Sequence, residues 1–112
     1  MSREHRLYLQ DMRAACQKIA RFVADMSQSQ FFADEKTLDA VLKNLEVIGE
    51  AARNLPPEIR ERHPEVPWRR ISGLRDVVVH EYFGIDHDVL WDIIQNKVPA
   101  LLPQVNAMLD ET

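Results

Sequence analysis

The spacing of apolar residues near the start of the chain is the feature that most constrains the fold. Between Leu7 and Met26 the intervals alternate between three and four residues, at Leu9, Met12, Cys16, Ile19, Val23 and Met26. This spacing places the side chains along one face of an α-helix, nearly as in a coiled-coil seam. We therefore expect a long amphipathic helix over 7–26, ended by the polar segment 27–30. Cys16, the only cysteine, lies in this seam, which predicts a buried structural thiol.

A second long helix is predicted to follow and to return antiparallel to the first. Asp34 is a good N-cap, and Glu35 suits the first turn of a helix. Apolar residues continue at helical spacing from Leu38 to Leu55. Pro56 and Pro57 end this pattern, because proline lacks the N–H donor and restricts the residue before it.

The rest of the chain also predicts helices. They are a connector from Glu58 to His63, a helix from Pro67 to about Phe83 with Gly84 at its C-terminal cap, and a last helix capped by Asp86. Ile85 and Leu90 form a hydrophobic staple at the start of that last helix, and Pro99 and Pro103 should bend it. The run of valines at 77–79 has no second strand to pair with. The prediction is one all-α domain over residues 1–112, an up-and-down bundle of four to five helices.

Composition excludes several classes of protein. No run of about 18 apolar residues is present, which predicts no membrane span, and the charged N-terminus is followed by no signal-peptide core. A cytoplasmic location is expected. The net charge of −4 argues against unspecific coating of nucleic acid. Six of the 14 basic residues nevertheless fall within one stretch, all arginine: Arg53, Arg60, Arg62, Arg69, Arg70 and Arg75. Arginine suits bidentate contact with phosphate, although a solvated face also explains such a run.

The segment whose side chains are best suited to catalysis is Arg75-x-x-x-x-His80-x-Tyr82. On a helix Asp76 and His80 are direct neighbours, Arg75 and Tyr82 share a face, and the long Arg75 side chain can swing toward His80. These groups suit cleavage of RNA without a metal. His80 would accept a proton from a ribose 2′-hydroxyl, and Arg75 would stabilise the charge on the phosphate. Asp76 would orient the imidazole, and Tyr82 would position the phosphate or donate a proton.

The segment Ile71–Asp86 resembles the signature of the HepT family of HEPN proteins, and 44–51 resembles that family's second helix. The resemblance spans essentially the whole chain. It implies a helical bundle that forms a homodimer, with the two Arg-x4-His-x-Tyr motifs facing each other. It implies a metal-independent endoribonuclease toxin that needs no cofactor. The implied partner is an MNT-type nucleotidyltransferase antitoxin, which would neutralise the toxin by transferring AMP to Tyr82.

Other interpretations compete with this one. The bundle could be a non-catalytic adaptor that binds nucleotide or a nucleotidyltransferase, or a purely structural dimer. Glu46 and Glu50, four residues apart, could bind metal, but a solvated or dimer-lining face is favoured. His87 between Asp86 and Asp88 is more simply explained as a helix start. The four histidines and the cysteine show no metal-site spacing, so no metal is expected.

Overall fold

The computed structural model describes residues 2–80 and 86–111, with the backbone alone described for 75–80. Every regular element in these ranges is a helix, which confirms the all-α class. In chain order they are α1 (Arg3–Phe22), α2 (Gln28–Ala33), α3 (Glu35–Asn54), α4 (Pro57–Arg62), α5 (Trp68–His80), α6 (His87–Asp92), the π-helical turn η2 (Ile93–Lys97) and α7 (Val98–Asp110).

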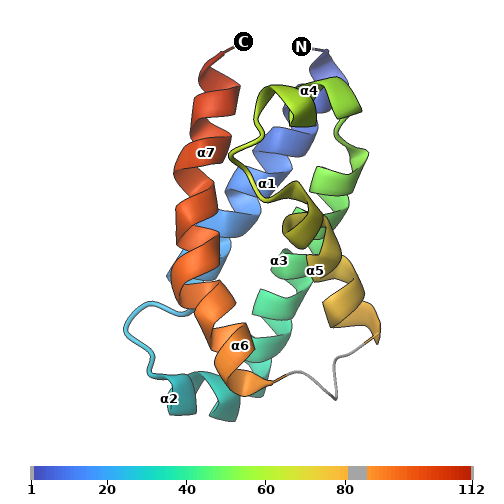
Figure 1. Ribbon diagram of the computed structural model, residues 1–112. Helices are drawn as coiled ribbons and strands as arrows, with labels where there is room; N and C mark the ends of the chain where they lie inside the picture. The colour runs from blue at the N-terminus through green and yellow to red at the C-terminus, as the bar shows by residue number, and fades with distance from the viewer. Residues whose placement is uncertain (1, 81–85, 112) are drawn as a thin grey trace.

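The long helices alternate in direction and form an up-and-down bundle (Figure 1). α1 leads away from the end of the molecule where both termini lie, α3 returns, α5 leads away again, and α6 to α7 return. α1 packs against α3 and α7, and α3 packs against α5. The antiparallel pairing of the first two long helices is therefore confirmed. α5 lies on α3 at the edge of the bundle, a position that matters for the site below.

The first helix ends four residues earlier than its apolar spacing predicts. α1 begins after Ser2, whose hydroxyl accepts a hydrogen bond from the His5 N–H, and it ends at Phe22. Asp25 has a φ of 63°, a left-handed conformation that an α-helix does not accommodate. Val23 keeps its place in the core although it lies beyond the helix.

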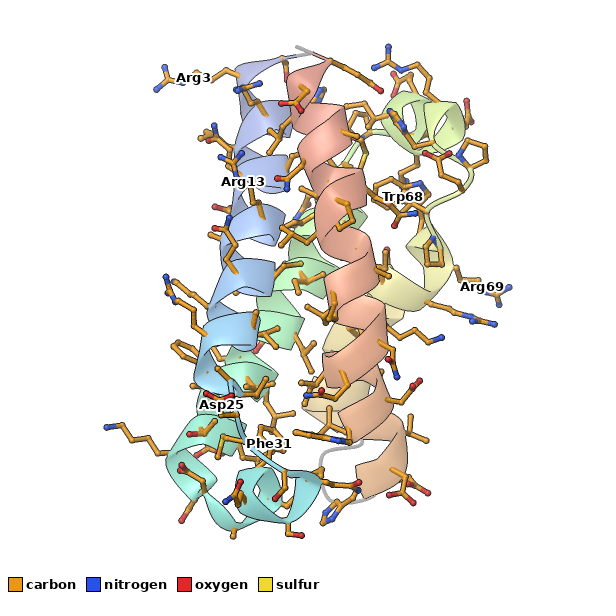
Figure 2. The ribbon with its side chains drawn as sticks, turned by 90° about the vertical axis from the view of Figure 1, so that its left-hand side faces the viewer. Arg3, Arg13, Asp25, Phe31, Trp68 and Arg69 are labelled. Atoms are coloured by element: carbon orange, nitrogen blue, oxygen red, sulfur yellow. The ribbon has the colours of Figure 1, made fainter. Side chains whose placement is uncertain are left out.

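The polar segment expected only to end the first helix also begins a short one. Ser27 caps α2 in a capping box, in which its hydroxyl accepts from the Gln30 N–H and the Gln30 side chain accepts from the Ser27 N–H. Phe31 of this helix is fully buried, with its ring 4.9 Å from that of Phe32 and 5.5 Å from that of Trp91. Figure 2 shows Phe31 closing the end of the bundle opposite the termini.

The remaining helix starts agree with the predicted caps, with small shifts. Asp34 accepts a hydrogen bond from the Thr37 N–H at the start of α3, and Asp86 accepts from the N–H groups of Asp88 and Val89 at the start of α6. α4 provides the predicted connector. Pro67 lies immediately before α5 rather than in its first turn, and its carbonyl accepts from the Ile71 N–H. The predicted roles of Gly84 and Ile85 fall outside the described residues.

A π-helical turn precedes Pro99, where the sequence predicts a kink. Proline has no N–H to donate, and its ring crowds the carbonyl four residues earlier. In η2 the Val98 N–H instead donates to the carbonyl of Ile93, five residues back. The chain then continues through Pro103 as α7.

A continuous hydrophobic core joins α1, α3, α5 and the α6–α7 segment. Leu9, Ile19, Leu45, Ile48 and Val105 are among its fully enclosed side chains. Cys16 lies in this core, 1% exposed, and burial raises the pKa of its thiol to about 12. The interpretation of Cys16 as a buried structural thiol is thereby confirmed. No helix in the described ranges has the length and apolar character needed to cross a membrane.

Candidate active site

Three residues of the predicted motif, Arg75, Asp76 and His80, lie on α5, and the first turns of that helix are firmly anchored. Ile71 is buried against the core, and Trp68 and Leu74 pack on it from the same helix. The Trp68 indole N–H donates to the His63 carbonyl oxygen at 2.9 Å, which ties the start of α5 to the end of α4. These contacts fix the direction in which the rest of α5 extends.

The backbone of Arg75, Asp76 and His80 continues this helix without interruption. Positions 76 and 80 are one turn apart and adjacent, and position 75 lies on a neighbouring face. The helical placement of Arg75, Asp76 and His80 is therefore as expected. The convergence of its side chains, and the position of Tyr82, fall outside the described residues and remain predictions.

Three arginines of the basic stretch come together beside the start of α5. Arg53 at the end of α3, Arg60 on α4 and Arg69 on α5 line a surface pocket of about 720 Å³. We call this the arginine pocket; its other lining residues are Pro57, Glu61, Trp68, Ser72 and Gly73. Arg62 and Arg70 do not line it, so the stretch divides between a pocket and the surrounding surface.

The pair Glu46 and Glu50 lines a smaller groove of about 220 Å³ between α1 and α3, with Tyr8 and Asp11 on its other side. The Lys43 Nζ lies 3.9 Å from a Glu46 carboxylate oxygen. Across the described residues, no group of three or more His, Cys, Asp or Glu side chains is placed to hold a metal ion. The geometry of this groove agrees with a solvated face.

Two other histidines, His87 and His63, make contacts that hold parts of the fold together. His87 stacks on Phe32, with ring centroids 3.8 Å apart, in the first turn of α6, so the helix-start interpretation is confirmed. His63 is 9% exposed, with Nδ1 3.3 Å from Glu65 and Nε2 3.1 Å from Glu111. It thus joins the end of α4 to the end of α7. No local pattern around His63 predicts this contact, because Glu111 lies 48 residues away.

The fold is that of an all-α bundle of the HEPN type, with a helix-borne Arg-x4-His sequence at its edge. The model of the family described as "Ribonuclease HepT-like" matches residues 12–108. The chain therefore belongs to the HepT-like ribonuclease family, and the expected class of enzyme, a ribonuclease, is confirmed.

Relatives of similar length agree with this assignment. "Probable ribonuclease HepT" of Thermococcus cleftensis is 41% identical over 101 residues, which cover 90% of this chain and 92% of the relative. "Putative RNase MJ0127" of Methanocaldococcus jannaschii is 40% identical over 106 residues, covering 95% and 88%. "Putative RNase TTE0752" of Caldanaerobacter subterraneus subsp. tengcongensis is 39% identical over 106 residues, covering 95% of each chain. No solved structure gives a significant match.

Proposed function

We propose that this chain is a metal-independent endoribonuclease whose catalytic pair is Arg75 and His80. The observation that carries the proposal is the placement of both residues on one continuous helix, at the edge of a bundle that belongs to a ribonuclease family. A helix gives both residues a fixed spacing, and the edge position gives RNA access to them.

The chemistry is transfer of the phosphate to the neighbouring ribose oxygen. Neutral His80 accepts the 2′-hydroxyl proton while the 2′-oxygen attacks phosphorus. The bond from phosphorus to the 5′-oxygen breaks, and the leaving oxygen takes a proton from an acid. The products are a 2′,3′-cyclic phosphate and a 5′-hydroxyl. Arg75 stabilises the negative charge that grows on the phosphate oxygens, and Asp76 orients the imidazole.

A homodimer supplies the second proton carrier. One histidine cannot be base and acid in the same concerted step, whereas a two-fold axis would place His80 of both copies in one cleft. The position of α5 supports this arrangement, because among the long helices in the described ranges it packs mainly on α3 and lies at the edge of the bundle.

The resemblance supports a role as the toxin of a toxin–antitoxin pair. Tyr82 follows His80 by two residues, so an AMP group attached to its hydroxyl would add bulk and negative charge beside the catalytic pair. Both effects oppose the entry of RNA. The partner in this proposal is an MNT-type nucleotidyltransferase that carries out the transfer.

The test is cleavage of total bacterial RNA in EDTA by the wild type, by His80→Ala and by His5→Ala. His5 is a matched control, because it lies on the first turn of α1 near the termini and far from the end of α5 (Figure 1). Loss of a general base predicts that His80→Ala is slower by a factor of about 100 or more. His5→Ala should cut like the wild type. Equal cleavage by all three proteins would overturn the assignment of His80.

The adaptor alternative rests on the acidic net charge of −4, which is unusual for a protein that binds RNA. It predicts that none of the three proteins cuts RNA while all of them bind a nucleotidyltransferase.

The antitoxin mechanism has a separate test. Mass spectrometry after incubation with the nucleotidyltransferase and ATP would show whether the mass added at Tyr82 is that of AMP and not of a larger group. Modification elsewhere, or none, would contradict the antitoxin mechanism.

A further inference from the structure

The arginine pocket concentrates positive charge in a chain that is acidic as a whole. Arg53, Arg60 and Arg69 line it together with one carboxylate, Glu61, whereas the chain carries a net charge of −4. Its volume of about 720 Å³ falls in the range of ligand sites. Three helices contribute to it, so these charges are gathered by the fold and not merely by proximity in sequence.

Two polar atoms of pocket residues are buried without a partner. The Arg60 Nε and the Ser72 Oγ are both enclosed, and neither has a hydrogen-bond partner among the described residues. Buried donors in proteins almost always have acceptors, and leaving one unpaired costs free energy. Both groups can donate to an oxygen. A phosphate presents only acceptor oxygens and suits the planar guanidinium of Arg60.

Trp68 adds an apolar wall to the pocket. Its indole N–H is already used by the His63 carbonyl, so the ring, and not its donor, is what it offers to a ligand. Aromatic rings stack on bases of any identity. Figure 2 shows the Trp68 side chain directed toward the bundle and that of Arg69 directed away from it, so the two reach different parts of a ligand.

The pocket lies on the same stripe of α5 as the predicted catalytic histidine. Positions 69, 72, 76 and 80 follow one another at intervals of three or four residues along one side of the helix, and position 73 is four residues after position 69. Eight residues separate positions 72 and 80, a rise of about 12 Å. A strand of RNA that follows this stripe from position 80 therefore passes over the pocket. The pocket lies at the N-terminal end of α5, which is the positive end of the helix dipole.

We propose that the arginine pocket is a second phosphate-binding subsite, which holds the RNA backbone a short distance from the bond that is cut. This inference rests on the proposed ribonuclease function. The pocket holds the substrate in place and takes no part in the chemistry. The Arg60 guanidinium and the Ser72 hydroxyl donate to the phosphate, Arg69 adds charge from the rim, and Trp68 contacts the adjacent base or ribose.

The test measures binding and cleavage separately. In a His80→Ala background, a fluorescent single-stranded RNA is titrated at several salt concentrations against the added substitutions Arg60→Gln, Arg69→Gln and Arg3→Gln. Arg3 is the matched control, because it lies at the start of α1, on the opposite side of the molecule from Arg69 (Figure 2). Each pocket substitution should weaken binding by about tenfold and reduce the slope of log Kd against log salt by about 0.7. Arg3→Gln should change neither.

With His80 intact, the pocket variants should raise KM while leaving kcat nearly unchanged, whereas His80→Ala removes kcat. Because Arg60 is partly buried, thermal unfolding shows whether the Arg60→Gln variant is folded, and the exposed Arg69 provides an independent test.

The outcomes separate the subsite from the catalytic proposal. Cleavage that depends on His80, with RNA binding equal in the pocket and Arg3 variants, would overturn the subsite alone. Weaker RNA binding in the pocket variants without any wild-type cleavage would support the subsite and overturn the catalytic proposal. If AMP or inorganic phosphate binds as tightly as the RNA and with the same dependence on Arg60, the ligand is a free phosphate compound and the RNA subsite is refuted.

Discussion

Replacement of Phe31 by alanine tests how the short helix α2 closes one end of the bundle. The ring is fully buried and contacts Phe32 and Trp91, so it joins the short helix α2 to α6. Burial of such a side chain is worth about 1.5–3 kcal/mol, and the cavity left by its loss adds about 1–2 kcal/mol. We expect Phe31→Ala to lower the free energy of unfolding by about 3–5 kcal/mol, a large share of the total for a small domain.

Urea unfolding followed by circular dichroism measures this loss. With a typical slope of about 2 kcal/mol per molar urea, the midpoint should fall by about 2 M. All variants are compared at one protein concentration, because dimerisation would make stability depend on it. Phe22→Ala is the matched control, since Phe22 is 38% exposed at the end of α1, and it should cost less than about 1 kcal/mol. Equal midpoints for the two variants would refute the enclosure of Phe31.

Two further predictions concern titratable groups. Because burial raises the pKa of Cys16 to about 12, iodoacetamide at pH 8 should label the native protein far more slowly than the urea-unfolded protein; equal rates would contradict its burial. Hydrogen bonds from the Thr37 N–H and hydroxyl lower the pKa of Asp34, so its stabilising effect is present above the ordinary carboxyl pKa and is lost as pH falls through the lowered value. The difference in Tm between wild type and Asp34→Ala should therefore be larger at pH 7 than at pH 2, and a constant difference would contradict this cap.

Helix starts were predictable because their signals are local. Asp34 and Asp86 cap the helices that directly follow them, and each needs only the next three residues to do so. The end of α1 was not predictable from its apolar spacing, because Val23 stays in the core while Asp25 turns the chain. Ser27 and Gln30 did carry a capping-box pattern, but six residues are too few for a clear helical period.

In the candidate site, too, local features could be predicted from the sequence and features that depend on packing could not. The helical placement of Arg75 and His80 follows from the sequence around them. The arginine pocket does not, because Arg53, Arg60 and Arg69 belong to three helices and only packing decides which arginines meet. In the sequence alone, a solvated face explained that stretch equally well.

The π-helical turn at Ile93–Lys97 sets the rotational phase between two parts of one long helical segment. With five residues in the hydrogen-bonded loop instead of four, α6 is turned about the common axis relative to α7. Leu90 before the turn and Ile94 within it can thus face the core together with Leu101 and Val105 beyond it. Deletion of one residue within the turn would allow a continuous α-helix but rotate α6 by about 100°. The chain would then enter α6 at Asp86 from a different direction, so the length of this turn sets how α6 is oriented relative to α7.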